Sequence, residues 1–132
     1  MSAIQNFSVH VEMCELYGNE EYNKEGLVEI NYVSNGVSLR WDIMDPSTYS
    51  LEFYETLLSN MKNNIKYERG EGGNSRSSIE YKDNKLVIHA QVGGSGGDQN
   101  VFLTLNRDDA IELVELILTR YKEACEKFES TM

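Results

Sequence analysis

The chain has only two cysteines, Cys14 and Cys125, among its 132 residues. Two cysteines this far apart, with no CxxC motif, exclude a disulfide scaffold and predict reduced thiols in a cytoplasmic protein. No apolar run approaches the roughly 20 residues that a membrane-spanning helix needs. The first residues, Met1 to Phe7, lack the basic and apolar regions of a secretory signal peptide, so we expect no such peptide.

Basic residues are scarce. The 12 lysines and arginines stand against 22 acids, which gives a formal net charge of −10. Residues 1–61 hold ten acids and two bases (−8), whereas residues 62–132 hold twelve acids and ten bases (−2). Because nucleic acids and anionic membranes are polyanions, this charge argues against both as ligands. It favours a basic protein partner, and the alternative is an acidic surface that only interacts with solvent.

Catalytic motifs are also missing. The segment GGSGG at 93–97 is followed by a strand pattern, whereas a nucleophile elbow or a dinucleotide-binding loop must lead into a helix. No Lys-Ser/Thr follows it, so it is not a P-loop. Carboxylates are plentiful, but no pair stands out for acid–base work. We therefore expect a protein that is not an enzyme and that carries no cofactor or metal.

The first half of the chain shows a clear strand pattern. Apolar and polar residues alternate over 7–14, 27–33 and 37–44, which predicts three half-buried strands. Asn35 and Gly36 favour a tight type I′ turn between the last two. The polar segment GNEEYNKEG at 18–26 is typical of a loop. These segments predict an antiparallel meander.

Two helices are expected, each after a group of strands. Apolar residues from Leu51 to Met61 recur at helical spacing after candidate caps at Asp45, Ser47 and Ser50. Strand patterns return at 78–82, 85–92 and 101–105. A longer amphipathic helix follows Asn106, which we expect to be its N-cap. The order βββα-βββα in one domain, residues 1–132, predicts an α+β fold. In it, two amphipathic helices pack on one face of an antiparallel β-sheet.

The acidic first half supplies the candidate binding residues. Tyrosine is favoured at protein interfaces, and Tyr17, Tyr22, Tyr49 and Tyr67 lie in or next to predicted loops. Their alternative role is packing on their own fold. Together with the acids, they predict a partner-binding surface formed by Glu20, Glu21, Tyr22, Glu25 and Glu29.

A small anionic ligand is the second hypothesis. The glycine-rich segments 69–77 and 92–100 should lie at the same end of the sheet, where free backbone N–H groups can bind an anion. The candidate residues are Arg69, Ser75, Arg76, Gly94, Ser95 and Gly96. His10 and His89, with Cys14 or Glu12, could in principle hold a metal, but they have no ligand spacing and more simply face solvent.

Part of the chain resembles a known class of small proteins. Residues 37–121, with NKLVIHAQV and then VFLTLNRDDAIELVELI leading into the last helix, resemble small immunity proteins of bacterial polymorphic-toxin systems. Small phage-encoded inhibitors of bacterial defence share this size and acidity. The resemblance implies neutralisation of a basic toxin or nucleic-acid-handling enzyme by binding. It assigns a role to no residue and leaves self-association open.

Overall fold

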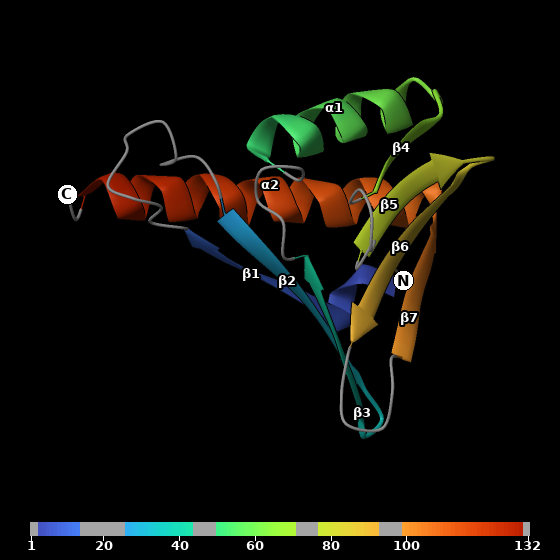
Figure 1. Cartoon of the computed structure of the whole chain (residues 1–132), viewed down its shortest axis with the longest axis horizontal. Helices are drawn as coiled ribbons and strands as arrows, with labels where there is room; N and C mark the ends of the chain where they lie inside the picture. The colour runs from blue at the N-terminus through green and yellow to red at the C-terminus, as the bar shows by residue number, and fades with distance from the viewer. Residues whose placement is uncertain (1–2, 14–25, 44–49, 71–76, 93–98, 131–132) are drawn as a thin grey trace.

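A computed structural model describes residues 3–13, 26–43, 50–70, 77–92 and 99–130 and confirms the α+β fold with antiparallel strands. In Figure 1, helix α2 runs along the length of the molecule, with α1 on one side of it and β1, β2 and β3 on the other. The elements in chain order are η1 (Ala3–Asn6), β1 (Phe7–Met13), β2 (Gly26–Ser34), β3 (Val37–Ile43), α1 (Leu51–Lys62), β4 (Tyr67–Gly70), β5 (Ser77–Lys82), β6 (Lys85–Val92), β7 (Gln99–Asn106) and α2 (Arg107–Ser130).

The first sheet is the predicted meander, with strand order β1-β2-β3. The turn between β2 and β3 has φ of 48° at Asn35 and 82° at Gly36, the positive values that a type I′ turn requires. Val9 pairs with Ile30 and Ile30 with Trp41, so the apolar residues of all three strands share one face. That face is buried, and Trp41 is only 2% exposed.

The end of the β2–β3 hairpin departs from the predicted burial. Val37 and Leu39 lie on the same face as Trp41, as expected, but they are 51% and 40% exposed. Val37 is exposed because β1 begins at Phe7 opposite Tyr32 and has no residue to pair beyond it, while Leu39 lies level with this first residue of β1. The hairpin therefore projects past its neighbour (Figure 1).

The second sheet has four strands in the order β4-β5-β6-β7, one more than the sequence pattern predicted. The extra strand, β4, is short and polar, and it forms by pairing with β5. The β5–β6 hairpin turns through Asp83 and Asn84, whose φ values of 54° and 63° are again positive. The two groups of strands thus form separate sheets, and β3 lies beside β6 where they meet.

Both helices begin where a side chain can cap them. The Ser50 Oγ accepts a hydrogen bond from the Phe53 N–H (3.3 Å), and the Asn106 Oδ1 accepts one from the Asp109 N–H (2.9 Å). Asp45 and Ser47, the other candidate caps of α1, lie outside the described residues. At the other end of α1, the Arg107 guanidinium donates to the carbonyl oxygens of Met61 and Lys62, both at 2.9 Å. This cation stabilises a helix C-terminus and fixes α2 against α1.

Residues from both sheets and both helices form one buried cluster. Helix α2 contributes most of the helical part and contacts β1, β6 and β7, while α1 packs on α2. The Tyr54 and Tyr121 rings lie 6.2 Å apart between the two helices. In the part of the chain that the structure describes, neither helix is long and apolar enough to cross a membrane.

Candidate protein-binding surface

The face of the first sheet that points away from the core is polar and acidic. His10 pairs with Glu29 across β1 and β2, and Glu29 pairs with Asp42 across β2 and β3. We call this surface the outer face and define it by the residues whose strand positions share it: Ser8, His10, Glu12, Leu27, Glu29, Asn31, Val33, Ser38, Arg40 and Asp42. Leu27 and the exposed Val33 are its apolar members. The side chains of His10, Glu12 and Arg40 are exposed, whereas that of Glu29 is half-buried.

Glu29 is the one predicted partner-binding residue that the structure describes, and two neighbouring side chains contact its carboxylate. One oxygen lies 3.2 Å from Arg40 Nη1, and the other accepts a hydrogen bond from Asn31 Nδ2 at 3.1 Å. The Arg40 side chain is 60% exposed, so solvent screens this ion pair and it contributes only about 0–1 kcal/mol to stability.

The other predicted partner-binding residues, Glu20, Glu21, Tyr22 and Glu25, lie outside the described residues. The structure does fix where their segment leaves and rejoins the sheet, because Met13 pairs with Gly26. Glu12 and Leu27 pair next to this position. The acidic segment is thus joined to the outer face at the end that carries Glu12.

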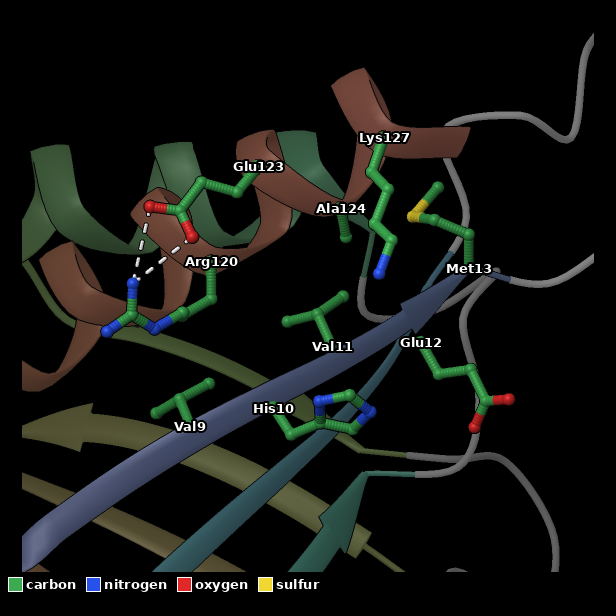
Figure 2. Close-up of a pocket in the computed structure, with 9 residues that line it drawn as sticks. All are labelled: Val9, His10, Val11, Glu12, Met13, Arg120, Glu123, Ala124 and Lys127. Atoms are coloured by element: carbon green, nitrogen blue, oxygen red, sulfur yellow. Dashed lines mark hydrogen bonds and ion pairs between the residues drawn. The ribbon is translucent and has the colours of Figure 1, made fainter. Parts of the chain in front are cut away.

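A groove lies along β1 on the side facing helix α2 (Figure 2). Its volume is about 510 Å³. In Figure 2, Val9 and Val11 point towards α2, and His10 and Glu12 point to the opposite side of the strand. Nine residues line the groove: Val9, His10, Val11, Glu12, Met13, Arg120, Glu123, Ala124 and Lys127.

The helical wall of the groove carries charges of both signs. Arg120 Nη1 donates to both carboxylate oxygens of Glu123, at 3.3 and 3.1 Å, so these two charges largely offset each other. Lys127 lies one turn further on, and Figure 2 shows its side chain reaching towards the Met13 end of β1. Between them, Ala124 leaves room for the groove because its side chain is small.

A close contact at Gly26 seats β1 and β2 against α2. The Gly26 N–H donates a 2.5 Å hydrogen bond to the hydroxyl of Tyr121, which is fully buried. A Cβ atom at Gly26 would lie only 2.9 Å from Val11 Cγ1 and 3.2 Å from the Tyr121 ring. The Cys125 thiol, 3.9 Å from the Met13 sulfur, packs beside this contact. These contacts fix the spacing between β1 and α2, and so the shape of the groove.

The residues predicted to bind an anion are mostly beyond what the structure describes. Ser75, Arg76, Gly94, Ser95 and Gly96 lie outside the described residues, and only the backbone of Arg69 is described, in β4 opposite Ile79. The strand ends that flank the two glycine-rich segments do lie at the same end of the second sheet. Gly70 pairs with Ser78, and Val92 pairs with Gln99.

The histidines are not brought together, because His10 lies in the first sheet and His89 in the second. Among the described residues, no group of three or more histidines, cysteines or carboxylates could hold a metal. His89 instead stacks on Phe102, with ring centroids 4.6 Å apart and ring planes 22° apart. Of the tyrosines considered for an interface, Tyr67 packs against Phe53 at 5.6 Å, which is the internal role. Tyr17, Tyr22 and Tyr49 lie outside the described residues.

No pattern in the sequence predicted the groove. Arg120, Glu123, Ala124 and Lys127 follow the i, i+3, i+4, i+7 spacing of one helix face, which was the available signal. Nothing in that spacing says that the face lies against β1, more than 100 residues earlier in the chain. Comparisons with known protein families, with curated proteins and with solved structures find no match to this chain.

Proposed function

We propose that this protein is a non-enzymatic binding protein, of the immunity or anti-defence type, that neutralises a basic protein partner. The observation that carries the proposal is the outer face, where Glu12, Glu29 and Asp42 lie on adjacent strands with Arg40 as the counter-charge. The described residues that flank the acidic segment with Glu20, Glu21, Tyr22 and Glu25 pair at the Glu12 end of this sheet, and we assign these four residues to the same binding surface.

The mechanism is electrostatic and steric. Carboxylates of the outer face bind lysines and arginines that the partner otherwise uses to hold phosphate, and the bound protein blocks access to them. Opposite net charges steer the two proteins together, with association rate constants of up to about 10⁸ to 10⁹ M⁻¹s⁻¹ at low salt. Since a toxin nuclease or a nucleic-acid-handling enzyme acts on a polyanion, it carries the required basic surface. We place this action in the cytoplasm, where Cys125 and Cys14 stay reduced.

The test uses the tagged full-length protein as bait in a lysate of the native host at low salt. Three baits are compared: the wild type, the outer-face variant Glu12→Gln/Glu29→Gln, and the helix variant Glu55→Gln/Glu115→Gln. Both variants remove the same charge, and the four side chains are exposed or half-buried, so both should fold. The helix variant therefore controls for net charge alone.

We expect the wild type and the helix variant to retain the same basic protein and the outer-face variant to lose it by about tenfold. The purified partner should then lose its activity when mixed with one equivalent of wild-type protein. Equal recovery by all three baits would contradict a role for the outer face. A partner that keeps full activity in the complex would contradict neutralisation.

The second candidate function is a binder of a small anion, and the common end of the two flanking strand pairs supports it. In this alternative, Arg69 and Arg76 hold the anion beside Ser75, Gly94, Ser95 and Gly96. The test is a thermal-shift screen with inorganic phosphate and nucleotides. An increase in Tm that Arg76→Ala removes supports an anion site, and no shift with any anion refutes it.

A further inference from the structure

The β1 strand lies at the edge of its sheet. Of the strands that the structure describes, only β2 pairs with it. The far edge of such a strand presents a backbone N–H and C=O at every second residue, which can pair with another extended chain. The 510 Å³ groove runs along this part of β1, between the strand and α2.

The groove has the dimensions of a short extended segment. It follows β1 from Val9 to Met13, which spans about 13 Å at the rise of a strand. On the other wall it follows α2 from Arg120 to Lys127, about 10 Å at the rise of a helix. Four or five residues of extended chain therefore fit. The walls facing them are apolar at Val9, Val11 and Ala124, and both valines are only 7% exposed.

The charges around the edge determine which chain fits. In a strand added beside β1, successive side chains point to opposite faces. Those on one face enter the groove and contact Val9, Val11 and Ala124, so small apolar residues suit them. The side chains on the other face of the added strand lie beside His10 and Glu12, with Glu29 on the next strand. Basic residues therefore suit these positions. On the helical wall, Arg120 is paired with Glu123 and opposes these cations little. Lys127 adds a positive charge on the groove side of the added strand, where the apolar side chains enter, and not on the face beside His10 and Glu12.

A second copy of the chain fits this edge poorly. It would bring another Glu12 and Glu29 to the same surface, and each copy carries a formal net charge of −10. Like charges directly across a strand pair destabilise it. We propose that the edge of β1 opposite β2, which no other described strand pairs with, binds an extended segment of the basic partner. The segment has alternating small apolar and basic residues and adds as a strand along the groove. This inference rests on the proposed function only for the charge of the partner.

The test uses a synthetic peptide in place of the unidentified partner. An acetylated and amidated hexapeptide of alternating valine and lysine is titrated into the ¹⁵N-labelled full-length protein. The control peptide has the same composition, with its valines grouped before its lysines. Amide hydrogen exchange is then measured along β1. The alternating peptide should slow exchange by about tenfold at every second amide between Ser8 and Met13, and the grouped peptide should not.

Two matched variants test the groove itself. Ala124→Gln fills it from the helical wall, and Thr119→Gln places the same side chain on the exposed surface of α2 outside the groove. We expect Ala124→Gln to weaken binding of the alternating peptide by about tenfold and Thr119→Gln to leave it unchanged. Equal binding by both variants overturns the inference, as does exchange in β1 that neither peptide slows. Protection of β1 that depends on protein concentration without peptide also overturns it, because a second copy then occupies the edge.

The native partner separates this inference from the proposed function. If the partner binds Ala124→Gln normally but no longer binds Glu12→Gln/Glu29→Gln, strand addition is refuted and the acidic surface stays supported. If the partner no longer binds Ala124→Gln but still binds the outer-face variant, the electrostatic function is refuted and the groove remains the binding site.

Discussion

Replacing Gly26 by alanine tests the contact that sets the spacing between β1 and α2. The added Cβ would lie 2.9 Å from Val11 Cγ1, 3.2 Å from the Tyr121 ring and 3.3 Å from the Met13 sulfur. Met13 is half-buried and its flexible chain can move away. Val11 and Tyr121 are 7% and 0% exposed, so one of them or the backbone must shift.

The expected cost follows from two opposing effects. Forcing an extra methyl group into a packed core destabilises a protein by about 1–3 kcal/mol. Replacing glycine also restricts the unfolded chain, which stabilises the folded state by about 0.4–1 kcal/mol. The net expectation for Gly26→Ala is a loss of about 1–2 kcal/mol in the free energy of unfolding. A shift of the Tyr121 ring in the variant would also lengthen the 2.5 Å hydrogen bond that its hydroxyl accepts from the Gly26 N–H, which adds to this loss.

Urea denaturation followed by the fluorescence of Trp41 measures this change, since the indole is buried in the same core. The denaturation midpoint should fall, and the slope of the transition should stay the same. A matched comparison repeats the substitution in a Val11→Ala background, where the nearest obstructing atom is gone. There the cost of Gly26→Ala should shrink by at least about 0.5 kcal/mol. An unchanged or raised midpoint for Gly26→Ala in the wild-type background would refute the packing argument.

Three further predictions concern the helices and the second sheet. Asn106→Ala removes the cap of α2 and should cost about 1 kcal/mol in urea denaturation; an unchanged midpoint would show that the Asp109 N–H finds another acceptor. Arg107→Met keeps the aliphatic contacts but removes both hydrogen bonds to the end of α1. Amide exchange there should speed up by about fivefold or more, and equal exchange rates would refute the capping role. Tyr81→Phe removes the 2.7 Å hydrogen bond to Asn64, and should lower the free energy of unfolding by about 1 kcal/mol; a stability equal to wild type would show that this bond contributes nothing net.

Local patterns in the sequence were sufficient to predict most of the individual strands and helices. Alternation predicted β1, β2 and β3, and the Asn35–Gly36 turn between the last two has the expected positive φ values. Asn106 caps α2 as predicted, because an N-cap depends on residues that are neighbours in the chain. Polar β4 was missed because its formation depends on pairing with β5, and its four residues carry no alternation of their own.

The sequence could not predict arrangements that depend on distant parts of the chain. The division into two sheets follows from strand pairing, and local alternation carries no information about which strands pair. The groove requires Ala124 of α2 and Val11 of β1 to lie on its facing walls, and the exposure of Val37 depends on where β1 begins. For the candidate surface, the sequence pointed to Glu29 through the charge of the first half, but not to its neighbours His10 and Arg40.

The most direct test of the central claim is the association rate constant of the recovered partner, measured at about 0.05 M and about 0.5 M salt. For the wild type, we predict fast association at low salt that slows by about tenfold or more at high salt, as screened electrostatic steering requires. The variant Glu12→Gln/Glu29→Gln should associate more slowly at low salt and depend less on salt, while Glu55→Gln/Glu115→Gln should resemble the wild type. Association of the wild type that is equally fast at both salt concentrations would contradict the acidic outer face as the binding surface.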